Sequence, residues 1–226
     1  MLLALVIAFA ASFLVTHLAL SHGKVRQDLV GQLGTFRFRA LYSFVAVGTF
    51  LPAVVVFWVG RPLGPVLWQL PRWLELAVAL PLTLLAVLLV VLAFATPSPV
   101  SMVPARPEVR GVLRVTRHPF NMGMAAFGLA HLVANGTLGE VVFFGCCFVL
   151  VGLVGAFHQD ARIASERGEV LAGFLRQTSV VPFAALLLRR TRLVPSELPL
   201  PMVVVAVAGW VALVLLHGRL FGAALL

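Results

Sequence analysis

Long apolar runs alternate with short polar segments along the whole chain. Twenty residues of α-helix, at about 1.5 Å per residue, are enough to cross the roughly 30 Å of hydrocarbon in a bilayer. The runs predicted to be membrane-spanning helices cover about residues 2–21, 40–59, 73–95, 119–135, 138–157 and 201–221. The pattern therefore predicts an all-α fold, a polytopic transmembrane helix bundle of about six spans, with residues 1–226 forming one integral membrane domain.

Two apolar stretches differ from the others. The fourth run is short and contains glycine, so we expect it to pack against protein rather than lipid. The stretch from Val180 to Leu188 is too short to span and is expected to be half-buried or interfacial. Pro52 and Pro81 fall inside runs, where a membrane helix tolerates proline as a kink.

Composition supports lipid as the solvent. Hydrophobic residues make up 61% of the chain, charged residues 11%, and the mean hydropathy is +1.06. Soluble domains contain roughly a quarter charged residues, so a water-soluble protein is excluded. The net charge of +9 would suggest nucleic acid in a soluble chain. Here the basic residues flank the apolar runs, so we expect the lipid bilayer as the partner and no nucleic acid.

Basic residues also predict the orientation. Segments 22–39, 97–118 and 158–200 hold 14 of the 17 Lys and Arg residues: Lys24, Arg26, Arg37, Arg39, Arg106, Arg110, Arg114, Arg117, Arg162, Arg167, Arg176, Arg189, Arg190 and Arg192. Basic loops concentrate on the cytoplasmic side, so these segments are predicted there and both termini on the other side. Because the first basic residues follow the first run, we interpret that run as a retained helix rather than a signal peptide.

Histidines inside apolar runs are the first candidates for chemistry. His17 and His131 lie within such runs, where ionisable groups are rare and usually functional. A neutral imidazole is a good iron ligand, but a hydrogen bond to a neighbouring helix is the simpler explanation of a buried histidine. His22, His158 and His217 lie near span ends and are interpreted as interfacial polar residues. Cys146 and Cys147 are expected to pack in the core.

The sharpest local motif is Arg117-His118-Pro119, at the start of the fourth run. Proline suits the first turn of a helix, and an arginine beside a helix start can hold a carboxylate or phosphate. An ordinary basic helix start is the simpler alternative. A second polar cluster follows the fifth run, and within it Arg162 and Glu166 share a helix face. A solvated amphipathic helix and a binding site both account for that cluster.

Several short sequence motifs lie between about residues 10 and 185. They are Phe13-x-x-x-His17, Gly34 with Arg39-Ala40-Leu41-Tyr42-Ser43, Arg117-His118-Pro119, Ala130-His131-Leu132 with Asn135-Gly136, Asp160-x-Arg162, Gly168-Glu169 and Thr178-Ser179-x-x-Pro182-Phe183. In order and spacing they resemble the NnrU family of bacterial membrane proteins, whose relatives include plant zeta-carotene isomerase. The last run, 201–221, is an additional C-terminal span.

The resemblance implies an integral protein of the bacterial inner membrane that binds haem b. It implies a role in nitrogen-oxide metabolism, as in denitrifiers, or a redox-gated cis–trans isomerisation of a carotenoid-type or other isoprenoid-like apolar molecule. The plant enzyme's haem ligands match His17 and His131, and Gly128 stands where that enzyme has a cysteine. Arg39, Arg114 and Arg117 are candidates to pair with the haem propionates.

Helix geometry leaves the ligand pair open. His17 and His118 both lie toward the cytoplasmic ends of antiparallel spans, whereas His131 lies roughly 20 Å farther along the fourth span. A pair formed by His17 and His131 requires a shifted or tilted helix, and His17 with His118 fits the simpler arrangement. All three histidines are therefore kept as metal ligand candidates.

Two other functions stay open. The block from Arg117 to Gly123 also resembles membrane methyltransferases of the isoprenylcysteine and phospholipid type, in which it helps to hold S-adenosylmethionine. Asn121 stands where that family usually has tyrosine. The third possibility is a non-enzymatic membrane assembly factor with structural histidines.

Overall fold

The computed structural model describes residues 1–101 and 105–222, and no β-strand occurs in these ranges. The α-helices are α1 (Leu2–Ser21), α2 (Gly23–Gly60), α3 (Arg72–Ala95), α4 (Pro119–Ala134), α5 (Leu138–Phe144), α6 (Val151–Gln177), α7 (Ala184–Leu187) and α8 (Leu200–Phe221). A π-helical turn, Gly145–Leu150, joins α5 to α6, so residues 138–177 form one continuous helix. Short 3-10 helices occupy Gly111–Arg114 and Pro195–Glu197.

Within the described residues, five helices are long and apolar enough to cross a membrane: α1, α2, α3, the continuous α5–α6 helix and α8. The sixth apolar helix, α4, has 16 residues and lies inside the bundle. The predicted all-α transmembrane bundle is confirmed. Four predicted runs match α1, α3, α4 and α8 to within one residue at each end.

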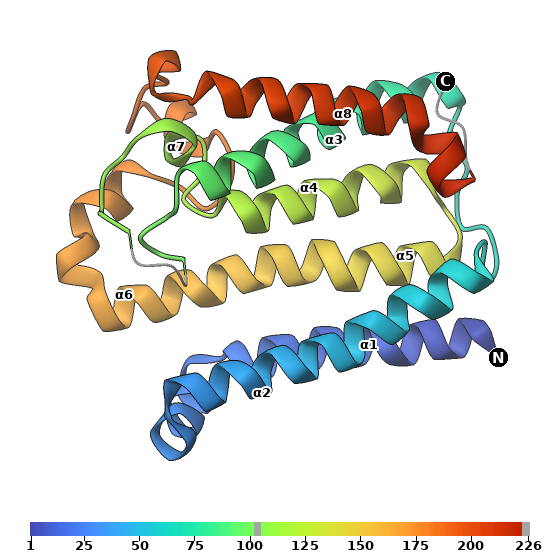
Figure 1. Cartoon of the computed structure of the whole chain (residues 1–226), viewed down its shortest axis with the longest axis horizontal. Helices are drawn as coiled ribbons and strands as arrows, with labels where there is room; N and C mark the ends of the chain where they lie inside the picture. Colours follow the sequence, from blue (N-terminus) through green and yellow to red (C-terminus); the bar gives the residue numbers. More distant parts are fainter. Residues whose placement is uncertain (102–104, 223–226) are drawn as a thin grey trace.

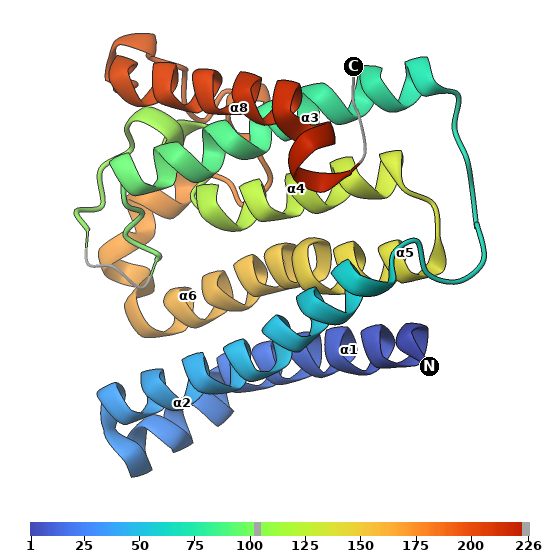
Figure 2. The same ribbon diagram turned by 45° about the vertical axis from the view of Figure 1, so that its right-hand side comes forward.

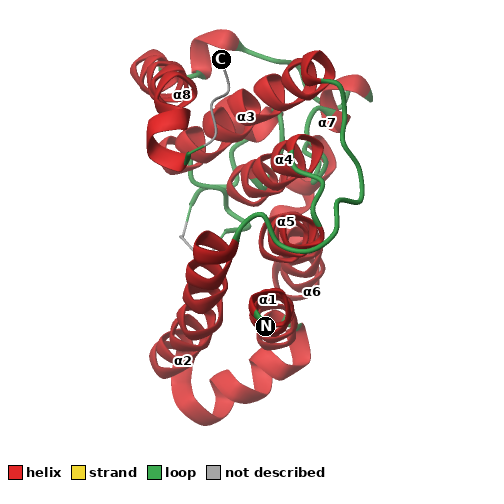
Figure 3. Ribbon diagram, turned by 90° about the vertical axis from the view of Figure 1, so that its right-hand side faces the viewer, coloured by secondary structure: helices red, strands yellow, loops and turns green. Residues whose placement is uncertain are grey.

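The helices lie side by side in a flattened bundle (Figures 1 and 2). The helix α4 packs along α3 on one side and against α6 on the other, and α8 packs on the outside of α3. The α1–α2 hairpin packs mainly through α1 against α5 and α6. Viewed along the helices, α8 and the α1–α2 hairpin form the two ends of an elongated cross-section (Figure 3).

The three basic segments meet at one end of the bundle. The α1–α2 turn, the described parts of the connection from α3 to α4, and the connection from α6 to α8 lie at this end, which we call the basic end (Figure 1). The start of α1, the end of α8, and the α2–α3 and α4–α5 connections lie at the opposite end. The predicted sorting of connections into two groups is therefore confirmed.

Small residues allow α4 to lie between other helices. A side chain at Gly123 would lie 2.7 Å from Val90 Cγ2 and 3.0 Å from the Ala86 carbonyl oxygen, both on α3. Across the other face, a side chain at Gly152 of α6 would lie 2.7 Å from the Asn121 carbonyl oxygen. Seven residues of α4 are buried, as expected for a helix that packs against protein. Close approach through small residues is typical of membrane helix packing.

Two helices are longer than their apolar runs. The helix α2 begins at Gly23 rather than near residue 40, because the polar stretch before the run is also helical. Gly34 interrupts it with φ 77° and ψ 159°, a conformation that favours glycine. Similarly, α6 continues past residue 157 to Gln177. The apolar pattern marks the length inside hydrocarbon, not the length of the helix.

Buried side chains form two cores. The basic-end core contains Leu89, Leu92, Val100, Val112, Leu113, Met122, Ala156, Ile163, Leu171, Phe174 and Val180. The aromatic core, between the α1–α2 hairpin and α5–α6, contains Val6, Ala10, Phe13, Ala53, Phe57, Phe143, Phe144, Cys147 and Phe148. Cys147 thus packs in a core and Cys146 packs against it, as predicted.

Candidate functional site

The chain before α4 is held by backbone pairing to a distant segment. The Arg117 N–H donates to the Ser179 carbonyl at 2.9 Å, and the Phe183 N–H donates to the Val115 carbonyl at 2.9 Å. The buried Thr116 hydroxyl donates to the Val180 carbonyl at 2.6 Å. The stretch 178–183, which follows α6, therefore fixes the position of the Arg-His-Pro motif. It is partly buried, as predicted for the region from Val180 to Leu188.

Arg117 and His118 share one carboxylate, Asp160 of α6. Arg117 Nε lies 2.8 Å from Asp160 Oδ1 and Nη2 lies 2.6 Å from Oδ2, which is a bidentate ion pair. His118 Nε2 lies 2.9 Å from Asp160 Oδ1. Arg117 Nη1 donates to the carbonyls of Thr178 at 2.9 Å and Leu175 at 3.2 Å. We call Arg117, His118 and Asp160 the polar clamp.

The clamp is enclosed, and its donors are engaged. His118 is only 3% exposed, and each of the three guanidinium nitrogens of Arg117 has an acceptor. With Asp160 ionised and therefore able only to accept, the hydrogen between it and His118 belongs to His118 Nε2. This arrangement ties α4, α6 and the stretch 178–183 together. It leaves Nε2 of His118 no lone pair for a metal.

The other candidate cofactor-binding residues lie in different places. Asn121, one turn after His118, faces α6, where a side chain at Gly155 would lie 3.5 Å from Asn121 Nδ2. Arg114 forms a separate bidentate pair with Glu197, both contacts being 2.7 Å long. Arg39 is exposed on α2.

The Arg114–Glu197 pair links two loops at the basic end. Glu197 also accepts the Gly111 N–H at 2.7 Å, and Arg114 Nη1 donates to Thr191 Oγ1 at 3.0 Å. The hydrogen bond from Arg114 lowers the pKa of Glu197 from 4.5 to about 2, and the same bond raises the pKa of Arg114. The pair therefore holds the segment 189–197 against the loop that precedes α4.

His17 has a different environment. It lies near the end of α1, with its ring centroid 5.1 Å from that of Phe13 and 4.9 Å from that of Tyr42. Its Nδ1 is buried and has no hydrogen-bond partner in the part of the chain that the structure describes. A buried nitrogen without a partner is uncommon and unfavourable, so it needs an explanation.

His131 is held by ordinary packing. Its Nδ1 lies 2.8 Å from the Phe127 carbonyl oxygen, one turn earlier in α4. Its ring stacks on Phe144 with centroids 4.5 Å apart and an interplanar angle of 23°. The bond is made within α4 itself, not to a neighbouring helix as the simpler alternative expected, and because a carbonyl only accepts, it places the hydrogen on Nδ1.

The structure separates the three candidate histidines. His17 is near the end of α1 and His118 precedes α4, both toward the basic end, whereas His131 is near the far end of α4 (Figure 1). Thirteen residues of α4 correspond to roughly 20 Å, so His118 and His131 cannot share one iron. Across residues 1–101 and 105–222, no three His, Cys, Asp or Glu side chains gather as a metal site.

Sequence reasoning missed the environment of three residues. Glu197, the partner of Arg114, has no distinguishing pattern around it. Asp160 lies in a recognised block, but its partners are 43 and 42 residues away. His158, interpreted as interfacial, has a buried Nδ1 without a described partner, and its ring lies 5.8 Å from that of His22. Only the packing of α1 against α6 reveals the environment of His158.

Residues 4–225 match the protein family described as NnrU protein. The chain is 36% identical over 78 residues to a chloroplastic 15-cis-zeta-carotene isomerase of Arabidopsis thaliana, covering 34% of this chain and 20% of the relative. It is 35% identical over 85 residues to the enzyme of the same name from Zea mays, covering 37% and 22%. The chain thus matches about a fifth of the length of these relatives. No solved structure matches it. Because the family match extends over nearly every residue, the chain is a member of the NnrU family.

Proposed function

We propose that this protein is a membrane-embedded isomerase that changes the cis–trans geometry of an apolar, isoprenoid-like polyene with the help of haem b. Its two relatives named 15-cis-zeta-carotene isomerase support the reaction class. The observation that carries the cofactor is the buried, unpartnered Nδ1 of His17. None of the described residues satisfies that nitrogen, and a neutral imidazole nitrogen is a common ligand of haem iron.

His17 acts in this proposal as a single protein ligand. His118 and His131 lie toward opposite ends of α4, and their bonds to Asp160 and the Phe127 carbonyl each occupy only one ring nitrogen, so either could ligate a metal only through its other nitrogen. Haem b supplies one-electron redox chemistry when it is bound. The chain's own residues exclude water and hold the ring of His17: Phe13 and Tyr42 pack against it, and Phe50 packs against Phe13 with centroids 5.0 Å apart. The aromatic core provides an apolar surface suited to a polyene.

An absorbance spectrum tests the cofactor. The full chain, purified in detergent from haem-replete cells, is expected to show a Soret band that His17→Ala abolishes. His131→Ala is the matched control and is expected to keep the band. A colourless wild-type protein contradicts the proposal, and loss of the band in both variants means that the ligands are a pair. Activity is measured separately, as conversion of a 15-cis carotenoid in liposomes.

The alternative role in nitrogen-oxide metabolism also uses haem b, so a measurement of activity is needed to distinguish it from the isomerase. If the haem-loaded protein leaves cis carotenoids unchanged but its deletion impairs nitrite or nitric oxide reduction in the cell, the accessory role replaces the isomerase. The methyltransferase receives less support, because the guanidinium of Arg117 is occupied by Asp160 and two carbonyls. Failure of S-adenosylmethionine to bind at millimolar concentration removes that alternative.

We also propose that the basic end faces the cytoplasm of a bacterial inner membrane. The three basic segments at one end of the bundle support this orientation. A C-terminal fusion to a reporter that is active only outside the cytoplasm is expected to be active. Activity of a cytoplasmic reporter at the same position contradicts the orientation.

A further inference from the structure

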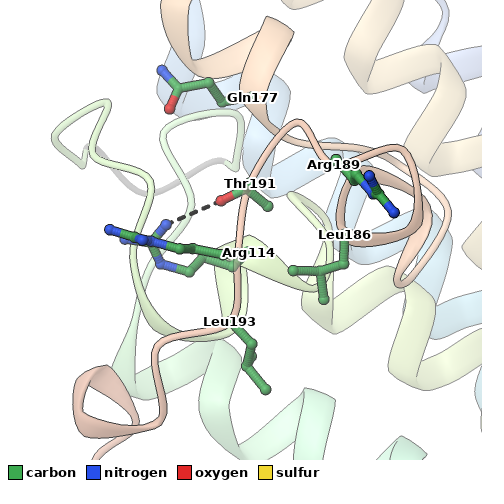
Figure 4. Close-up of a pocket in the computed structure, with 7 residues that line it drawn as sticks. Arg114, Gln177, Leu186, Arg189, Thr191 and Leu193 are labelled. Atoms are coloured by element: carbon green, nitrogen blue, oxygen red, sulfur yellow. Dashed lines mark hydrogen bonds between the residues drawn. The ribbon is translucent and has the colours of Figure 1, made fainter.

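A hollow at the basic end lies beside the Arg114–Glu197 pair, and its lining includes none of Arg117, His118 or His17. It measures about 630 Å³ and is lined by side chains from the loop before α4, from the end of α6, from α7 and from the segment that follows α7. Arg114 is hydrogen-bonded to Thr191 across it, and Leu186 and Arg189 lie on the other side (Figure 4). The lining also includes Arg192 and Leu193, and it contains no acidic side chain.

The charges in the hollow are not balanced. Glu197 neutralises Arg114, but neither Arg189 nor Arg192 has an ion-pair partner among the described residues. Both are exposed. Three guanidinium groups with one carboxylate leave a local excess of positive charge. Basic pockets of this kind on membrane proteins bind anionic head groups, and guanidinium suits phosphate because of its planar set of donors.

Two further features of the hollow favour a phosphate on an apolar carrier. Thr191 accepts its hydrogen bond from Arg114, so its own hydroxyl hydrogen stays available to an anion. Leu186 and Leu193 line the hollow, and Leu187 and Leu188 beside it are exposed by 81% and 66%. Exposed leucines next to arginines place this segment at the level where head groups meet hydrocarbon. A solvated basic loop that only sets topology needs neither a hollow nor these leucines.

We infer that this hollow is a binding site for a phosphate group, carried either by an anionic lipid head group or by a soluble phosphate or diphosphate. Arg189, Arg192 and the Thr191 hydroxyl hold the phosphate oxygens, and the Arg114–Glu197 pair keeps the segment in place. The site is separate from His17, so it does not depend on the proposed isomerase activity.

The test uses the full chain in dodecyl maltoside with dioctanoyl phosphatidic acid as the probe and dioctanoyl phosphatidylcholine as its neutral comparison, measured by calorimetry. The double variant Arg189→Gln with Arg192→Gln is expected to bind phosphatidic acid about 30-fold more weakly, because each lost basic contact weakens binding about fivefold. The matched control, Lys24→Gln with Arg37→Gln, removes two charges elsewhere on the basic segments and is expected to change affinity less than about twofold.

Equal weakening in both double variants, or no saturable binding of phosphatidic acid to the wild type, overturns the proposal. Inorganic diphosphate distinguishes the source of the phosphate: displacement of the lipid means that the phosphate alone is recognised, and no displacement means that the acyl chains are needed. Arg189→Lys with Arg192→Lys restores the charge but not the planar donors, so it is expected to recover only part of the affinity. Size-exclusion profiles establish folding, and Thr191→Val, which leaves all charges in place, is a second variant that is expected to bind more weakly.

Discussion

His118 lies beside the basic-end core and His17 beside the aromatic core, and the two imidazoles have opposite surroundings. His118 shares Asp160 with Arg117, and every guanidinium nitrogen of Arg117 has an acceptor. His17 has aromatic neighbours and a buried nitrogen without a described partner. Polar groups in hydrocarbon must be satisfied from within the protein. A satisfied group is explained by folding, whereas an unsatisfied one points to a ligand.

The polar clamp is expected to contribute strongly to the stability of the fold. Asp160→Ala leaves Arg117 and the buried His118 without their carboxylate. Breaking this partly buried pair is expected to cost about 2 to 3 kcal/mol, less than the roughly 3 to 5 kcal/mol typical of a fully buried pair. Unfolding of the purified protein in detergent, followed by circular dichroism, measures this loss. Glu166→Ala, which breaks the exposed pair with Arg162 on the same helix, is the control and is expected to cost about 0.5 kcal/mol. Similar effects of the two variants contradict the clamp.

The packing that brings Asp160 to α4 is tested by a single methyl group. A side chain at Gly152 would lie 2.7 Å from the Asn121 carbonyl oxygen, so Gly152→Ala forces α4 and α6 apart. Overpacking of this kind costs about 1 to 3 kcal/mol. Gly173→Ala, where no atom lies within 4 Å, is expected to be neutral or to stabilise by up to about 1 kcal/mol. Equal thermal stability of the two variants contradicts this prediction and means that α4 and α6 shift to accommodate the methyl group at no cost in stability.

Replacing His17 or His131 by phenylalanine is expected to change the stability of the cofactor-free protein in opposite directions. His17→Phe removes a buried nitrogen that has no described partner and is expected to stabilise the cofactor-free protein by about 1 kcal/mol. His131→Phe removes the bond to the Phe127 carbonyl and is expected to destabilise it by about 1 kcal/mol. Denaturation of haem-free protein measures both. Destabilisation by His17→Phe indicates a structural role and weakens its assignment as a ligand.

Acid is expected to break the Arg114–Glu197 pair at the basic end. Because Arg114 lowers the pKa of Glu197 from 4.5 to about 2, the pair stabilises the fold fully above pH 4.5 and loses its contribution as the pH falls toward 2. Glu197→Gln is expected to remove this part of the pH dependence. Protease sensitivity of the segment 189–197 measures it, and an unchanged profile in the variant contradicts the assignment.

The sequence by itself determined the membrane architecture. Hydrocarbon demands apolar helices of a set length, so the ends of α1, α3, α4 and α8 can be predicted from the apolar runs. The alternation of spans and connections also places the basic segments at one end of the bundle. Helix geometry separates His131 from His118, because residues thirteen apart on one helix lie roughly 20 Å apart.

Only the tertiary structure decided which polar groups meet. Asp160 is 43 residues from Arg117, and Glu197 is 83 residues from Arg114, so no helical periodicity connects either pair. Their contacts depend on how closely α4 approaches α6 at Gly152 and on how the stretch 178–183 folds back onto residues 115–117. The burial of His17 between Phe13 and Tyr42 likewise depends on the α1–α2 packing. Hydropathy constrains the depth of a residue, but packing between helices selects its neighbours.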